Sequence, residues 1–346
     1  MSSSPTNRPG AALARSHTIQ LVREKLPHLD VQTIAHRLSY GSFVSLEHKI
    51  LYFETPKAAC TTIKSLLRDL CGAPPMEYPV GAHRESRRDM FIHIRSNVPV
   101  PSLLDLDEQT QRHVLTAPDF LRFSIVRNPY TRLVSAWRNK IMLCEPGYEH
   151  IYRKLMGDMP SLHSKKILAF EQFLRFIENE PDLRSCNAHW RRQVDLLLYP
   201  AIPYTHIGKL EQLPMTMDLI GKHLGAAKPL RAGRSNSTVG GGRDPIDAAT
   251  AARIYALYAE DFEAFDYDRE SWQNISDSRD DPAVVPETRF IDEIIERNLI
   301  ISYLYEQHAE AESRYRDRYR LSLARVRNRL SRVWDAVRRP SKVTAR

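Results

Sequence analysis

The sequence lacks the features that mark membrane-spanning and metal-binding proteins. No apolar stretch approaches the length of a membrane-spanning helix, and the first ten residues contain no hydrophobic segment of a secretion signal. The four cysteines, Cys60, Cys71, Cys144 and Cys186, form no CxxC pair, so neither a zinc site nor a disulfide framework is indicated. We therefore expect a soluble, cytoplasmic protein of a reducing compartment that uses no metal.

Glycine is absent where a common nucleotide-binding loop would require it. The GxxxxGK[ST] pattern of P-loop kinases is missing, and no glycine lies between Ile50 and Cys71. No carboxylate is evidently placed to hold Mg²⁺ beside such a loop. A P-loop-type kinase is therefore disfavoured, although it stays open as an alternative function.

The positive charge of the chain is concentrated in its last 36 residues. The net charge is +8, but residues 311–346 contain twelve Lys or Arg and three acidic residues. Apolar residues recur there at helical spacing: Tyr319, Leu323, Val326, Leu330, Val333 and Val337. This basic amphipathic helix could lie on an anionic membrane surface, pair with a second copy of the chain or pack on its own domain. No nucleic-acid-binding motif accompanies the charge, so no nucleic acid is expected.

What the chain does contain is two similar segments about seventy residues apart. The first begins with a buried strand over Ile50–Phe53 and continues as a helix from Cys60 or Thr61. The backbone N–H groups of Ala58–Thr62 are predicted to lack intrahelical partners and to form an anion cradle. Lys57 lies at the mouth of this cradle. The thiol of Cys60 would be partly activated by the helix N-terminus, but we expect that Cys60 occupies this position because of its size.

The second segment repeats this order of strand, polar turn and helix. Phe123–Val126 predicts the strand, Asn128 an N-cap and Pro129 the first helical position. Arg127 ends the strand, and Ser135 lies two helical turns further on, so one anion alongside the helix could reach both. Arg132 and Arg138 are further cations, for which we expect solvated or ion-paired surface positions. Two anion sites in one α/β domain indicate a ligand with two anionic ends.

The two segments resemble carbohydrate sulfotransferases of the chondroitin, dermatan and HNK-1 type, which use 3′-phosphoadenosine 5′-phosphosulfate. In that family a Pro-Lys-Ala-(Gly/Ala)-Cys-(Ser/Thr) loop binds the 5′-phosphosulfate, and a Val-Arg-x-Pro-x-x-Arg-Leu-x-Ser-Ala helix start binds the 3′-phosphate. Pro56–Thr62 and Val126–Ala136 match these motifs. Three further blocks look similar, so that the resemblance covers about residues 45–270: His189–Gln193, Tyr204–Glu211 and Tyr258–Phe265. Animal members carry an N-terminal membrane anchor that is not seen here, which suggests a bacterial-like member.

The resemblance implies a P-loop-like three-layer α/β fold with a central parallel sheet and flanking helices, followed by a C-terminal helical extension. It implies in-line transfer of a sulfuryl group to a hydroxyl of a glycan or glycolipid. Lys57 would stabilise the leaving phosphate. The implied nucleotide-binding residues are Pro56, Lys57, Ala58, Ala59, Cys60, Thr61, Thr62, Arg127, Ser135 and Arg234, the last in a Gly/Ser/Arg-rich segment over 231–244.

The acceptor hydroxyl needs a general base, for which histidine is suited. His93 lies between the two nucleotide motifs, and His189 lies in a block of resemblance. Either could instead be structural, and Glu54 is a third candidate. A nucleotide-binding protein without turnover also stays open.

The chain is predicted to have four parts. Residues 1–17 form a disordered N-terminus, 18–275 the sulfotransferase domain, 276–310 a linker with helices and 311–346 the basic helix. Within the domain we expect a leading helix around Ile19–Leu29, a strand over Tyr204–Ile207 and helices over Leu213–Leu224 and Ala248–Phe265.

Overall fold

The computed structural model describes residues 16–74, 92–142, 145, 148–156, 169–179, 187–230 and 246–277, and the isolated positions 298 and 301. The chain divides into two compact units, Met1–Met142 with Leu168–Pro286, and Leu143–Ile167 with Glu287–Arg346. The second unit contains helix α8 (Glu149–Met156). All other elements described below belong to the first unit.

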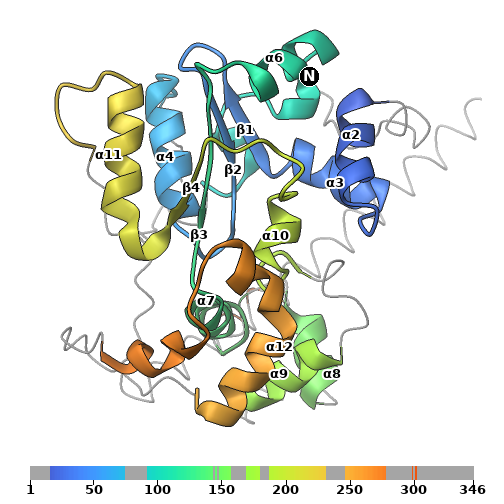
Figure 1. Cartoon of the computed structure of the whole chain (residues 1–346). Coiled ribbons are helices and arrows are strands. Elements are labelled where there is room, and N and C mark those ends of the chain that lie inside the picture. The colour runs from blue at the N-terminus through green and yellow to red at the C-terminus, as the bar shows by residue number, and fades with distance from the viewer. Residues whose placement is uncertain are drawn as a thin grey trace, which may run out of the picture. The chain divides into compact units, whose positions relative to one another are not determined.

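In the described residues, the first unit is built on a four-stranded, mostly parallel sheet (Figure 1). Its strands are β1 (Ser42–Ser45), β2 (Ile50–Phe53), β3 (Leu121–Val126) and β4 (His206–Lys209), and they lie in that order. β1 is antiparallel to β2, whereas β2, β3 and β4 run parallel. The carboxyl ends of these three strands therefore meet at one edge of the sheet, where ligands of open α/β sheets bind.

Helices connect and cover the strands. The α-helices of this unit in the described residues are α2 (His17–Lys25), α3 (Val31–Ser39), α4 (Cys60–Leu70), α6 (Glu108–Thr116), α7 (Pro129–Ala136), α9 (Phe170–Glu178), α10 (Gln193–Leu196), α11 (Leu213–His223) and α12 (Ala248–Ala264). The helical segments of other types are the 3-10 helices η2 (Arg95–Asn97), η3 (Leu103–Asp105), η5 (Leu210–Gln212) and η6 (Arg269–Asp277) and the π-helix η4 (Trp137–Met142).

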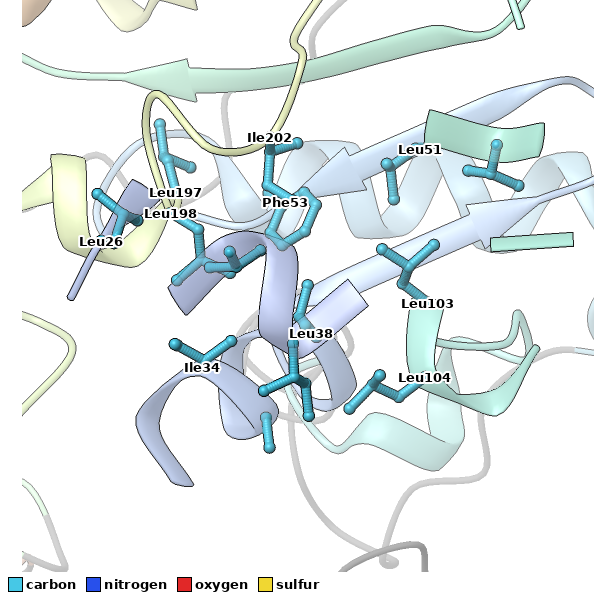
Figure 2. Close-up of a cluster of buried hydrophobic side chains, with 14 of the residues drawn as sticks. Leu26, Ile34, Leu38, Leu51, Phe53, Leu103, Leu104, Leu197, Leu198 and Ile202 are labelled. Atoms are coloured by element: carbon cyan, nitrogen blue, oxygen red, sulfur yellow. The ribbon is translucent and has the colours of Figure 1, made fainter. Parts of the chain in front are cut away.

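Two hydrophobic clusters hold these layers together, one on each face of the sheet. Successive side chains of a strand point to opposite faces. Ile50 and Tyr52 accordingly pack in the cluster that contains the apolar side of α4 and α11. Leu51 and Phe53 pack in the cluster that contains α2 and α3, part of which Figure 2 shows. The sheet is thus covered by helices on both faces, which confirms a mixed α/β architecture.

Most predicted elements are confirmed, and two need correction. The strand Ile50–Phe53 and the helix start at Cys60 are as predicted. The leading helix predicted around Ile19–Leu29 is α2, which ends earlier, at Lys25. A separate helix, α3, was not predicted; it starts after Asp30, whose side chain accepts a hydrogen bond from Thr33 N at 2.8 Å. The predicted strand Tyr204–Ile207 lies two residues later, since the ladder with β3 begins at His206. The antiparallel strand β1 was not predicted.

Several predictions concern parts of the chain beyond this description. Three predicted features lie outside the described residues: the segment 231–244 with Arg234, the C-terminal helix over 311–346, and residues 1–15 of the predicted N-terminus. His17, the last residue of that predicted N-terminus, already begins α2. Among the described residues, no helix combines the length and the apolar character needed to cross a membrane.

Candidate active site

The loop after β2 forms the first half of the site, at the carboxyl edge of the sheet. Its main chain enters the left-handed region twice, at Lys57 (φ 70°) and at Ala59 (φ 58°), immediately before α4. Residues with side chains adopt this conformation at a cost, and such strain is concentrated at functional sites. The N–H of Ala58 donates to Thr55 O at 3.2 Å. The cradle predicted over Ala58–Thr62 therefore does not include Ala58 as a donor.

The Cys60 thiol is not the activated group that its place at a helix start suggested. Its side chain is buried, with 8% of the residue exposed. Burial raises the pKa of Cys60, against the opposing positive charges of Lys64 and Lys57. The thiol is therefore protonated at neutral pH, which agrees with its interpretation as a residue chosen for size.

Lys57 connects this loop to the segment after α7. Its ammonium Nζ donates to Asn139 Oδ1 at 3.0 Å, and Asn139 belongs to the π-helix η4. Single π-helical turns occur often at functional sites. Asn139 was not among the predicted site residues. Its spacing of four from Ser135, which places both on one side of a helix, is the sequence signal that could have identified it.

Arg127 and the start of α7 form the second half of the site. Asn128 caps the helix as predicted, since its Oδ1 accepts from Tyr130 N at 3.0 Å. The Arg127 guanidinium donates to Thr131 Oγ1 at 2.9 Å and to the carbonyl oxygen of Lys57 at 3.3 Å. The two predicted anion-binding segments are therefore direct neighbours, joined through Arg127. Ser135 lies eight residues along the same chain, in a buried position of α7.

Arg132 is not the surface cation that was expected. Only 2% of the residue is exposed, and its guanidinium donates to the carbonyl oxygens of Pro56, Ala188 and Arg191 at 3.2, 2.9 and 2.8 Å. It therefore ties the first loop to the segment that carries His189. The prediction was wrong because the surrounding carbonyl groups come from distant parts of the chain.

The other blocks of resemblance hold the turn between β3 and α7. Gln193 Nε2 donates to Arg127 O at 2.8 Å, and Gln193 Oε1 accepts from Arg127 N at 2.9 Å. Glu211 Oε1 accepts from Asn128 N at 2.9 Å. Asp261 in turn accepts from Gln193 N at 2.8 Å and stays buried, and burial raises its pKa to about 6. These residues position the turn that is predicted to bind an anion.

His93 lies against the start of α4. Its Nε2 is 3.2 Å from Thr61 Oγ1, and its Nδ1 is 3.3 Å from the Nζ of Lys64. Burial and the positive charge of Lys64 lower the pKa of His93 to about 4. Lys64 is itself buried and forms an ion pair with Glu54, which was the third base candidate. His93 is therefore neutral at physiological pH.

His189 lies in the same positively charged surroundings but is held differently. Asn187 Oδ1 accepts from the backbone N–H of His189 at 3.0 Å and contacts the ring Nδ1 at 2.8 Å. Because this Asn187 atom accepts from the backbone, it is the amide oxygen, and Nδ1 must be the protonated ring nitrogen. The lone pair of His189 is then on Nε2. Burial, followed by the charges of Lys140 and Lys57, lowers the pKa of His189 well below its ordinary value.

The structure thus brings together most of the residues that the sequence suggested. Lys57 and Arg127 are in contact, His93 contacts Thr61, and the charge of Lys57 acts on both histidines. Within the described ranges, no group of three or more His, Cys, Asp or Glu side chains is placed to hold a metal ion. What the arrangement can do is bind two anionic groups near a neutral imidazole.

Comparison with known proteins supports this description. Residues 40–268 match the family model described as the Sulfotransferase family. Carbohydrate sulfotransferase 14 of Danio rerio is 31% identical over 197 residues, which are 54% of this chain and 49% of that protein. Carbohydrate sulfotransferase 11 of Danio rerio is 26% identical over 246 residues, and carbohydrate sulfotransferase 10 of Xenopus laevis is 28% identical over 248 residues. Each of these two matches covers 65% of this chain and 66% of the relative.

The chain therefore spans about half to two thirds of the length of these curated relatives. No solved structure gives a significant match.

Proposed function

The chain belongs to the sulfotransferase family, and from this premise we propose that it transfers a sulfuryl group from 3′-phosphoadenosine 5′-phosphosulfate to a hydroxyl group of a glycan or glycolipid. The observation that carries the proposal is the contact between the two anion-binding turns, in which the Arg127 guanidinium meets the carbonyl oxygen of Lys57 at 3.3 Å. Two cationic turns this close suit one small ligand with two anionic ends. The relatives named above are carbohydrate sulfotransferases, which supports a glycan acceptor.

The residues present fit such a nucleotide. The loop Pro56–Thr62 is proposed to offer hydroxyls, the Lys57 ammonium and backbone N–H groups other than that of Ala58 to a 5′-phosphosulfate. For the 3′-phosphate we propose Arg127, which precedes the N-cap of α7, and Ser135, which is buried within α7. Both turns follow parallel strands that end at one edge of the sheet, as in P-loop-like folds, to which we assign this domain. Arg234 is proposed as a further nucleotide-binding residue on resemblance alone.

When bound, the donor supplies a sulfuryl group that leaves the 5′-phosphate as the acceptor oxygen attacks in line. Lys57 and the loop donors would neutralise the charge that develops on the phosphate, and preorganised donors of this kind each contribute about 2.7–4 kcal/mol in other enzymes. Of the two candidate bases, we propose His189 because its Nε2 carries the lone pair needed to accept the hydroxyl proton.

The proposal is tested first by calorimetry with 3′-phosphoadenosine 5′-phosphate and AMP. The ligand with the 3′-phosphate should bind more tightly, by about 1.5–3 kcal/mol for the charge-assisted contact with Arg127. Arg127→Ala should remove this preference, whereas Arg112→Ala, an exposed arginine on α6, should not. Equal affinities for the two ligands in the wild type would contradict the proposal.

Turnover is tested second, with radiolabelled sulfate donor and a panel of glycans and glycolipids. Transfer to any member separates an enzyme from a nucleotide-binding protein without turnover. The cytoplasmic location, and the membrane contact or pairing of copies through residues 311–346, stay predictions that neither experiment requires.

A further inference from the structure

Behind the anion loop lies a group of polar side chains in which Thr61 belongs to the loop itself and the other members have no role in the reaction proposed above. Glu54 at the end of β2, Lys64 and Thr61 on α4 are all buried, with 5%, 2% and 6% of each residue exposed. His93 approaches from a separate segment, and its main-chain oxygen accepts from the Tyr40 hydroxyl at 3.2 Å. A buried ion pair with a histidine beside it is costly to assemble unless its hydrogen bonds are satisfied, so its place beside the loop calls for an explanation.

The direction of each hydrogen bond in this group follows from the chemistry of the side chains. Lys64 is paired with Glu54 and carries an ammonium, which can only donate. The Nδ1 of His93, 3.3 Å from that ammonium, must therefore accept. The proton of the neutral ring is then on Nε2, which donates to Thr61 Oγ1 at 3.2 Å. Because Thr61 Oγ1 accepts this hydrogen bond, the proton of the Thr61 hydroxyl points away from His93.

We propose that Lys64, His93 and Thr61 form a hydrogen-bond relay that orients the Thr61 hydroxyl as a donor to the 5′-phosphate side of the bound nucleotide. This inference rests on the proposed function. Thr61 lies in the first turn of α4, where the helix N-terminus also favours an anion. Each donor in the chain polarises the next, and the chain starts at a cation. His93 is accordingly a positioning residue, since both of its ring nitrogens are engaged and neither offers a lone pair to the acceptor hydroxyl.

The relay is tested by calorimetry with two ligands, 3′-phosphoadenosine 5′-phosphate and adenosine 3′-phosphate, which lacks the 5′-phosphate. His93→Asn removes the donor that reaches Thr61, whereas His93→Gln places an amide N–H near the position of Nε2. His93→Asn should weaken binding of the first ligand about 3- to 10-fold, the range of one hydrogen bond. Binding of adenosine 3′-phosphate should stay unchanged, and His93→Gln should restore most of the lost affinity.

A double-mutant cycle separates this role from a structural one. In the Thr61→Val background, His93→Asn should have no further effect on affinity, because the group that it orients is gone. Thr61→Ser, which keeps the hydroxyl, should behave as the wild type, and thermal unfolding shows which variants are folded. Equal losses for both ligands, or additive losses in the cycle, would overturn the relay. Normal affinity of His93→Asn with lost turnover would instead identify His93 as the base. Failure of the wild type to bind 3′-phosphoadenosine 5′-phosphate would overturn the proposed function and the relay with it.

Discussion

The side-chain amide of Gln193 forms a closed pair of hydrogen bonds with the main chain of Arg127. Its Nε2 donates to the Arg127 carbonyl at 2.8 Å, and its Oε1 accepts from the Arg127 N–H at 2.9 Å. Gln193 is fully buried and is held in turn by Asp261. A residue sixty-six positions away thereby satisfies both main-chain polar groups of the residue that follows β3. This pairing holds the main chain from which the Arg127 side chain extends to Thr131 Oγ1 and Lys57 O.

Gln193→Ala is expected to lower both stability and nucleotide affinity. The substitution leaves the N–H and C=O of Arg127 without this partner, and a buried polar group that loses its hydrogen bond costs about 1–3 kcal/mol. Thermal unfolding and calorimetry with 3′-phosphoadenosine 5′-phosphate measure the two effects. Gln212→Ala, which changes an exposed glutamine whose side chain makes no capping hydrogen bond to α11, is the matched control. An unchanged melting temperature for Gln193→Ala would show that the pairing is dispensable.

Lys57→Ala is expected to reduce turnover about 10²- to 10³-fold, as the loss of one preorganised donor does in other enzymes. The melting temperature should change little, because Lys57 is only half-buried and lies at a polar loop. Steady-state kinetics and thermal unfolding check the two parts. Lys228→Ala, on the exposed surface, should leave both unchanged. Near-normal turnover of Lys57→Ala would rule out its role toward the leaving phosphate.

Protonation of His189 should not decrease kcat/KM between about pH 7 and pH 6. Burial and neighbouring cations lower the pKa of His189 well below its ordinary value. A base with a lowered pKa keeps its lone pair down to that lower pH, so the acidic limb of kcat/KM should lie below the usual histidine range. His189→Ala should reduce turnover about 10²- to 10⁴-fold. The prediction would be wrong if kcat/KM of the wild type decreased below about pH 6.5 and the residual activity of His189→Ala did not show this decrease.

Asp261 should contribute more to the free energy of unfolding at mildly acidic pH than at neutral pH. Burial raises its pKa from 3.8 to about 6, so the folded state binds the proton more tightly than the unfolded state does. This contribution to the free energy of unfolding is fully present below about pH 4 and is lost as the pH rises through about 6. The difference in melting temperature between the wild type and Asp261→Asn should therefore decrease between about pH 4.5 and pH 7.

Asp261→Asn is the suitable comparison because it keeps the size of the side chain and does not titrate. It loses one hydrogen-bond acceptor at any pH, and so only the pH dependence of the difference is diagnostic. A difference that is constant, or that increases with pH, would show that the hydrogen bonds from Gln193 and Val194 outweigh burial of the carboxylate.

Both predicted anion-binding units could be recognised from the sequence as strand, turn and helix because their signals are local. Four apolar residues in a row predicted β2, helical spacing predicted α4 from Cys60, and Asn128 followed by Pro129 predicted the start of α7. A strand, a cap or a helix stripe depends on neighbours within a few residues, and those are visible in the sequence. The same holds for the family, since its motifs are short and contiguous.

The tertiary structure alone decided how these units act together. The left-handed conformation of Lys57 and Ala59 has no local signal, because neither residue is a glycine or an asparagine. Arginine is usually found at the protein surface, yet carbonyl groups from two other segments surround Arg132. The protonation states of His93 and His189 depend on burial and on cations brought in from elsewhere in the chain. Such properties arise between residues that are distant in sequence, so they exist only once the chain has folded.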